Sequence, residues 1–118
     1  MKELAIVNGS VYQNHGFHKT NVYIRRGLID VITPEFLPSE ETIDASGLFV
    51  IPGLIDPHVH LAMRNRFAQS ADDFESGSIA AAYGGVTTII DFLDEATSAL
   101  EVKQRFDERM KVAVNVHI

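Results

Sequence analysis

The sequence has no cysteine, an excess of acidic over basic residues and no long hydrophobic run. The absence of cysteine excludes disulfide frameworks, cysteine-ligated zinc sites and thiol nucleophiles. Ten Lys and Arg against sixteen Asp and Glu give a formal net charge of −6. This balance argues against a nucleic-acid-binding protein, whose affinity for phosphates comes from clustered cations.

The longest nearly continuous apolar stretch covers residues 48–55, far short of the ~20 residues that a membrane-spanning helix needs. The first ten residues lack the apolar core of a secretory signal. The composition, 46% hydrophobic and 22% charged, is ordinary for a globular protein, and 118 residues allow one domain. We therefore expect a cytoplasmic protein that binds neither nucleic acid nor a membrane.

Residues 1–53 show the pattern of short strands separated by turns. Asn8-Gly9 lies between two apolar runs, which is the strongest short-range signal for a β-hairpin. Pro34 and Pro38 bracket a loop, since proline cannot donate to a β-ladder. The spacing predicts a small sandwich or an open β-module. Strands are predicted at residues 4–7, 10–12, 20–25, 28–33, 42–45 and 48–51.

Beyond a boundary near Gly53, strand and helix patterns alternate. Ser70 with Asp73, and Ser98 with Glu101, have the spacing of capping boxes at the starts of two helices. An order of strand, helix, strand, helix, strand implies parallel strands with right-handed crossovers, as at the start of an α/β sheet or barrel. The predicted elements are strands at 54–61, 86–92 and 112–118, with helices at 71–83 and 99–110.

The segment IPGLIDPHVHL, residues 51–61, places polar side chains on one face of a strand. Because side chains alternate along a strand, Asp56, His58 and His60 share a face. Two imidazoles ~6–7 Å apart along the strand can both tilt onto one divalent cation, at ~2.0–2.1 Å from each nitrogen. Geometry alone suits zinc, manganese or iron equally. A catalytic zinc takes three protein ligands, so further ligands must come from elsewhere.

The alternative is that the two histidines are partly buried structural residues, which are common. Their position favours the metal site, because they end the first strand of a β-α-β run, where α/β barrels place active sites. Two histidines on one face of a strand interior are also uncommon without a partner charge.

PGLIDPHVHL resembles the first-strand metal motif of the amidohydrolase superfamily. The segment ADDFESGSIAAAYGGVTTIIDF is most similar to the cyclic amide hydrolases, dihydropyrimidinase and hydantoinase, with allantoinase and dihydroorotase close to them. This resemblance implies a TIM (β/α)8 barrel with two divalent metal ions per complete site, zinc being the expected ion. It also implies a flanking β-sandwich built from both chain ends, and a homo-oligomer.

The implied reaction opens the ring of a small cyclic amide such as a hydantoin or dihydropyrimidine. In that implied reaction a metal-bound hydroxide attacks the carbonyl carbon of the amide and the C–N bond breaks, while the metals lower the pKa of water and polarise the carbonyl. By the motif match, His58 and His60 are ligands of the more buried metal.

The family's other ligands, a carboxylated lysine, two more histidines and an aspartate, lie on later barrel strands. The 64 residues after Leu54 are about a quarter of the ~250 that a barrel requires. We therefore expect residues 1–53 to be part of the composite sandwich and residues 54–118 to be the start of the barrel. The chain would then be the N-terminal portion of a larger enzyme, inactive alone.

Position 62 bears on the substrate. Dihydroorotases and allantoinases resemble one another in having an arginine just after His-x-His-Leu, where it can hold a carboxylate or ureido group. Hydantoinases tend to have an acidic residue there, and Ala62 matches neither pattern. Arg64 or Arg66 could substitute, although solvated loop arginines are the more common case. The missing arginine counts against dihydroorotate as the substrate.

Other side chains have alternative interpretations. Asp56 would either orient an imidazole or form a hydrogen bond within the strand. Asp91 is expected to be structural, Asp94 to lie in a substrate loop, and His117 to be a core histidine or to support the ligands.

The barrel-like second half argues against a free-standing β-rich binding module, and two rival functions remain open on the sequence alone. One is an allantoinase or dihydroorotase. The other is a non-catalytic scaffold related to dihydropyrimidinases, against which the intact His58 and His60 argue.

Overall fold

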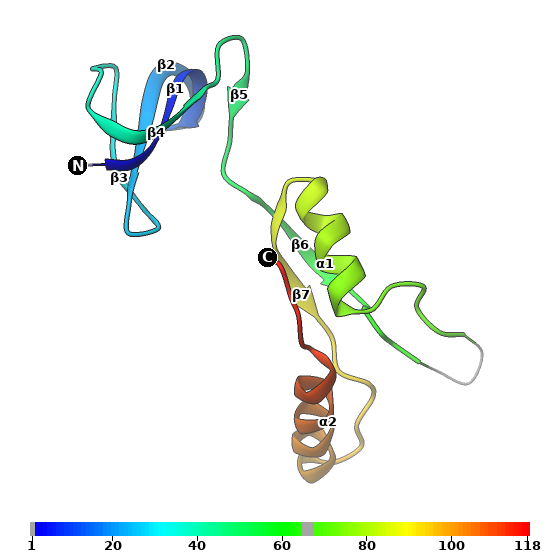
Figure 1. Cartoon of the computed structure of the whole chain (residues 1–118). Helices are drawn as coiled ribbons and strands as arrows, with labels where there is room; N and C mark the ends of the chain where they lie inside the picture. Colours follow the sequence, from blue (N-terminus) through cyan, green and yellow to red (C-terminus); the bar gives the residue numbers. More distant parts are fainter. Residues whose placement is uncertain (1, 65–67) are drawn as a thin grey trace. The chain divides into compact units, whose positions relative to one another are not determined.

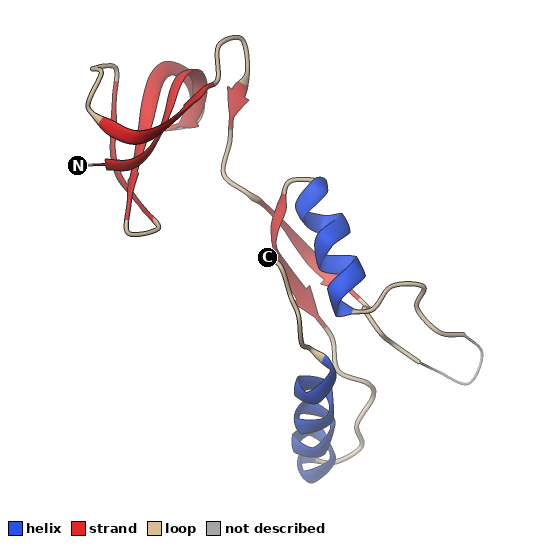
Figure 2. Cartoon of the chain, viewed as in Figure 1, coloured by secondary structure: helices blue, strands red, loops and turns tan. Residues whose placement is uncertain are grey.

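The computed structural model describes residues 2–64 and 68–118 (Figure 1). The chain divides into two compact units, Met1–Pro52 and Gly53–Ile118. The first is built of strands, and the second contains both helices among the described residues (Figure 2).

Within the described residues, the first unit forms one mixed sheet in the order β3-β2-β1-β4, with β5 also paired to β1. The hairpin neighbours β1–β2 and β2–β3 are antiparallel, whereas β4 and β5 run parallel to the two halves of β1. The bounds are β1 Lys2–Gln13, β2 Gly16–Arg25, β3 Leu28–Thr33, β4 Ser39–Asp44 and β5 Phe49–Val50.

The hairpin predicted at Asn8-Gly9 is wrong. β1 continues through both residues, and its register against β2 shifts between Ile6 and Gly9, which marks a β-bulge. Asn8 adopts a left-handed backbone with φ of 63°. Its backbone N–H donates to Oδ1 of Asn21 at 2.9 Å, and its side chain donates to Asp44 at 2.9 Å.

Gly9 is required at this bulge by a close approach. A Cβ on residue 9 would lie 2.6 Å from Cγ2 of Val50, in strand β5. The chain reverses instead at Asn14 and His15, both with positive φ. The Asn-Gly pair therefore serves the pairing of β1 with β5 and not a turn.

The core of the first unit lies around Tyr23, which is fully buried with Ala5 and Val7. The hydroxyl of Tyr23 donates to the carbonyl of Glu35 at 3.0 Å and accepts from the backbone N–H of Leu37 at 2.9 Å. The loop that connects β3 to β4 therefore supplies the hydrogen-bond partners of the buried Tyr23 hydroxyl.

The second unit has the order β6 (Leu54–Val59), α1 (Phe74–Tyr83), β7 (Val86–Asp91) and α2 (Ala99–Val112). β6 and β7 pair in parallel, with Val59 beside Asp91, so both strands end at the same edge. This arrangement confirms the predicted strand, helix and parallel strand. Neither of the described helices is long and apolar enough to cross a membrane.

The first helix begins three residues later than predicted, because Asp73 and not Ser70 is its N-cap. The Asp73 carboxylate accepts from the backbone N–H of Ser76 at 2.8 Å, and Oγ of Ser76 accepts in return from the backbone N–H of Asp73. The second helix is capped by Ser98 as predicted, although the Glu101 carboxylate accepts from Thr97.

The strand predicted at residues 112–118 is wrong. Val112 is the last residue of α2, and residues 113–118, all of them described, form no strand. Asn115 has a φ of 56°, which interrupts an extended backbone. The backbone N–H of His117 donates to Oγ of Ser78 in α1 at 3.1 Å, so a helix side chain takes the place of a strand partner.

Candidate metal centre

His58 and His60 bring their imidazoles together at the C-terminal end of β6. Their Nε2 atoms lie 2.9 Å apart, and the ring planes cross at 73°. Both side chains are exposed in this chain. The alternation of the strand thus places the two rings on one face, as the sequence predicts.

The separation of the two nitrogens fits a shared cation. Two nitrogen ligands at about 2.0–2.1 Å from one ion, and at about 90° to each other, would lie about 2.9 Å apart. A tetrahedral angle would need the nitrogens about 3.3 Å apart, a small opening of the same pair. In this structure the two nitrogens share a hydrogen bond, one ring donating to the other, and a cation would take the place of the shared proton.

Two ligands do not complete a metal site. Among residues 2–64 and 68–118, no group of three or more His, Cys, Asp or Glu is placed to hold a metal ion. A site built on His58 and His60 therefore needs ligands in addition to those in the described part of the chain.

An aromatic side chain from the neighbouring strand restricts the rings. Phe92 follows β7 directly and stacks on His58, with ring centroids 4.2 Å apart. The Phe92 ring also lies 5.6 Å from that of His60. The sequence reasoning did not single out this residue, because its partner lies on another strand.

Asp56 has a backbone role in this structure. Its carboxylate accepts a hydrogen bond from the backbone N–H of His58 at 3.1 Å. Of the two alternatives for Asp56, the structure shows the hydrogen bond within the strand.

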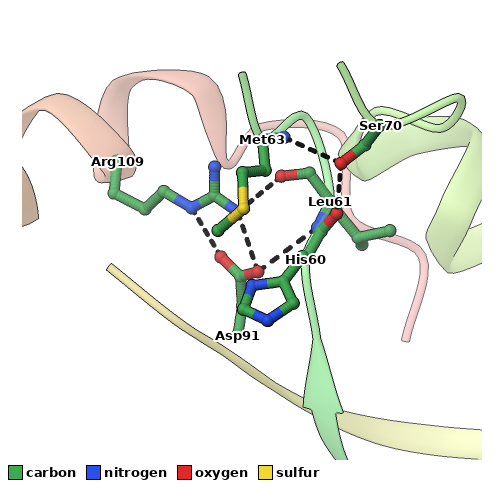
Figure 3. A network of polar contacts seen from close by, with 6 residues as sticks. All are labelled: His60, Leu61, Met63, Ser70, Asp91 and Arg109. Carbon is green, nitrogen blue, oxygen red and sulfur yellow. Dashed lines mark hydrogen bonds and ion pairs between the residues drawn. The ribbon is translucent and has the colours of Figure 1, made fainter. Parts of the chain in front are cut away.

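Asp91 and Arg109 form an ion pair close to His60 (Figure 3). Nε and Nη2 of Arg109 donate to the two carboxylate oxygens of Asp91 at 2.5 and 2.7 Å. Nη2 of Arg109 also donates to the carbonyl of Leu61, and the Leu61 N–H donates to Asp91 at 3.4 Å. The guanidinium lies 4.8 Å over the ring of Phe74. One arginine of α2 thus reaches β7, α1 and the segment that follows β6.

Sequence reasoning missed Arg109. A basic residue in the last turn of a helix is usual, because it complements the helix dipole, so position alone gave no signal.

The loop after His60 is held by Ser70. Its Oγ donates to the carbonyl of His60 at 2.6 Å and accepts from the backbone N–H of Met63 at 3.2 Å (Figure 3). Ala62 adopts a left-handed φ of 47°, and its N–H donates to the carbonyl of Asp72 at 2.8 Å. Ser70 therefore closes this loop and does not cap the helix.

Comparison with known proteins adds an independent finding. The sequence profile of the amidohydrolase family matches residues 49–118, more than half of the chain. The chain belongs to the amidohydrolase family. The matched region contains both histidines, Phe92, Asp91 and Arg109.

This amidohydrolase chain is similar to D-hydantoinases and dihydropyrimidinases. The D-hydantoinase of Geobacillus stearothermophilus is 48% identical over 88 residues, which cover 74% of this chain and 19% of that protein. Dihydropyrimidinase 1 of Caenorhabditis elegans is 45% identical over 91 residues, 75% of this chain and 19% of that protein. The chain thus spans about a fifth of the length of the curated relatives it matches.

Solved structures show the same likeness. A crystal structure of a D-hydantoinase superposes with a TM-score of 0.83 at 38% identity, covering 96% of this chain and 24% of that one. The predicted α/β fold class of the amidohydrolase chain, a β-sandwich segment followed by the first β/α units of a barrel, is confirmed by this likeness.

The structure brings some of the remaining candidates of the amidohydrolase chain together at one cavity of the second unit. Asp94 is exposed in the loop after β7 and lines the same cavity as Ala62 and Arg64, which is exposed as well. Arg66 lies outside the described residues. His117 has an exposed side chain, so it is not a core histidine in this structure.

Proposed function

We propose that this chain supplies two metal ligands, His58 and His60, to a hydrolase that opens the ring of a cyclic amide of the hydantoin or dihydropyrimidine type. The observation that carries the proposal is the 2.9 Å approach of the two Nε2 atoms at the C-terminal end of β6. It is supported by the position of the pair in the region matched by the amidohydrolase profile, and by similarity to D-hydantoinase and dihydropyrimidinase.

A divalent cation held there, zinc in our proposal and two per complete site, would lower the pKa of a bound water and polarise the amide carbonyl of the substrate. The residues of this chain would bind and orient the ion. His58 and His60 present their Nε2 atoms at a separation that suits one ion. Phe92 limits the rotation of the His58 ring by stacking on it.

The proposal also includes the arrangement of the larger protein. We assign residues 1–53 to a composite β-sandwich and residues 54–118 to the start of the catalytic barrel. The other ligands would come from later strands of that barrel. Asp94, Ala62 and Arg64 would face the substrate from the rim, and the larger protein would form the homo-oligomer that the family resemblance implies.

The test uses the protein at its full natural length, freed of metal and reconstituted with zinc. We expect hydrolysis of hydantoin or dihydrouracil, and loss of both bound zinc and turnover in His58→Ala and His60→Ala. His18→Ala, a change at an exposed histidine of β2, is the matched control and should retain both. Residues 1–118 alone should show no turnover.

Three results would contradict the proposal. Metal-dependent turnover that survives His58→Ala would remove the ligand assignment. Turnover confined to allantoin or dihydroorotate would show that the substrate is neither a hydantoin nor a dihydropyrimidine. A full-length protein that binds no metal and hydrolyses neither hydantoin, dihydrouracil, allantoin nor dihydroorotate would favour the non-catalytic scaffold as the function.

A further inference from the structure

We propose that Asp91 and Arg109 are positioning residues of this metal centre, which hold the backbone of Leu61 and thereby aim the imidazole of His60. The inference rests on the proposed function, because it takes His60 to be a metal ligand.

His60 needs support that His58 already has. His58 lies between the paired residues Asp56 and Val59, whereas β6 ends at Val59 and both His60 and Leu61 lie beyond it. A ligand must be held within ~0.5 Å of its working position, and a residue past the end of a strand needs contacts other than the β-ladder for this.

The ion pair provides those contacts. The Leu61 N–H donates to Asp91 and the Leu61 carbonyl accepts from Arg109, so both backbone polar groups of the residue after His60 bind one ion pair. On the other side, Ser70 donates to the carbonyl of His60 (Figure 3). Each polar group of the peptide units that follow the imidazole therefore has a fixed partner.

The side chain of Leu61 is fixed as well. A Cβ on Gly77 would lie 2.4 Å from Cδ2 of Leu61, which shows that α1 rests directly against this leucine. Leu61 is thus held through its backbone by α2 and β7, and through its side chain by α1.

The ion pair is built to be rigid. The side chains of Arg109 and Asp91 are only 14% and 16% exposed, which limits screening by solvent and salt. The guanidinium is further held over the Phe74 ring. Its planar fork serves two carboxylate oxygens and the Leu61 carbonyl at once, an arrangement that a lysine ammonium cannot reproduce.

The test measures cobalt binding to the metal-free protein at its full natural length, by affinity and by the visible absorption of the bound ion. Loss of a partner that orients a ligand typically weakens metal binding by ~10–100-fold. We expect this loss, with an altered cobalt spectrum, in Asp91→Asn and in Arg109→Lys. Matched controls on the same helix are Arg105→Lys and Asp107→Asn, whose partners Glu101 and Lys103 also lie on α2. Both controls should bind cobalt as the wild type does.

A merely structural ion pair would give a different result. The melting temperature would fall in Asp91→Asn, while the folded protein would bind cobalt with unchanged affinity and spectrum, and this would overturn the inference. Asp91→Asn keeps the shape of the side chain, so this variant alone distinguishes the two outcomes if Arg109→Lys does not fold.

His60→Ala separates the inference from the proposed function. If His60→Ala binds cobalt like the wild type, the proposed function fails and the inference fails with it. If His60→Ala loses cobalt while Asp91→Asn and Arg109→Lys retain the wild-type affinity and spectrum, the inference alone fails.

Discussion

Phe92 lies nearly flat against His58, with the ring planes only 29° apart. The two residues come from neighbouring parallel strands, since Phe92 directly follows β7 and His58 is in β6. The parallel register that sets Val59 beside Asp91 therefore also places an apolar ring against a candidate metal ligand.

Replacing Phe92 by alanine should loosen the His58 ring. An aromatic contact of this kind is worth ~0.5–1.5 kcal/mol, so cobalt binding should weaken by about 2–10-fold. The His58 ring protons should also lose their ring-current shift in an NMR spectrum. Tyr83→Ala, at an exposed position of α1, is the control. Unchanged His58 ring shifts in Phe92→Ala would show that the stacking does not exist in solution.

Gly77→Ala should destabilise the protein, against the ordinary preference of helices for alanine. The new Cβ would come 2.4 Å from Cδ2 of Leu61, so the leucine or the helix must move. In a Leu61→Ala background this clash is gone, and Gly77→Ala should then stabilise by up to ~1 kcal/mol. Chemical denaturation of the four proteins measures both effects. The same sign in both backgrounds would contradict the close approach of α1 to Leu61.

The N-cap of α1 predicts a specific loss of stability in acid. The hydrogen bond from the Ser76 backbone N–H, with a smaller contribution from the Ser76 side chain, holds the pKa of Asp73 below its usual 3.8. A carboxyl with a lowered folded-state pKa stabilises the protein above the unfolded pKa, and this stabilisation is lost as the pH falls through the folded-state value. Asp73→Asn keeps a capping oxygen that does not titrate.

Thermal unfolding followed by circular dichroism tests this cap. The wild type should be the more stable by a few degrees near neutral pH, because a charged cap also complements the helix dipole. That advantage should shrink as the pH falls below about 4. A difference between wild type and Asp73→Asn that stays constant down to pH 2 would mean that the Asp73 carboxylate does not cap the helix.

The spacing of residues along the sequence was enough to predict the features that depend only on local backbone geometry. The separation of two residues between His58 and His60 puts both rings on one strand face whatever the rest of the fold does. In the same way, the spacing of Ser98 and Glu101 located the start of α2.

The features that sequence reasoning missed depend on distant partners. Asn and Gly both tolerate positive φ, which suits a hairpin turn and a bulge alike. A bulge forms here and not a turn because Val50 approaches Gly9 closely. This contact cannot be predicted from the residues that neighbour Gly9 in the sequence. Arg109 likewise has the ordinary place of a basic residue at the end of a helix, and its partners Asp91 and Leu61 become visible only in three dimensions.

Residues 112–118 show that composition alone does not predict a strand. Residues 112–118 have the apolar, β-branched composition of a strand, but composition does not supply a pairing partner. A positive φ at Asn115 and the hydrogen bond from His117 to Ser78 set a different local path.

The pairing of β1 on both sides has a consequence for biosynthesis. Its first neighbour, β2, follows after a short turn and can form a hairpin as soon as it is made. Its other neighbours, β4 and β5, are the last strands of the first unit to be translated. One edge of β1 is therefore open on the nascent chain until residues 39–50 have left the ribosome. During that interval the edge is a template for pairing with other strands.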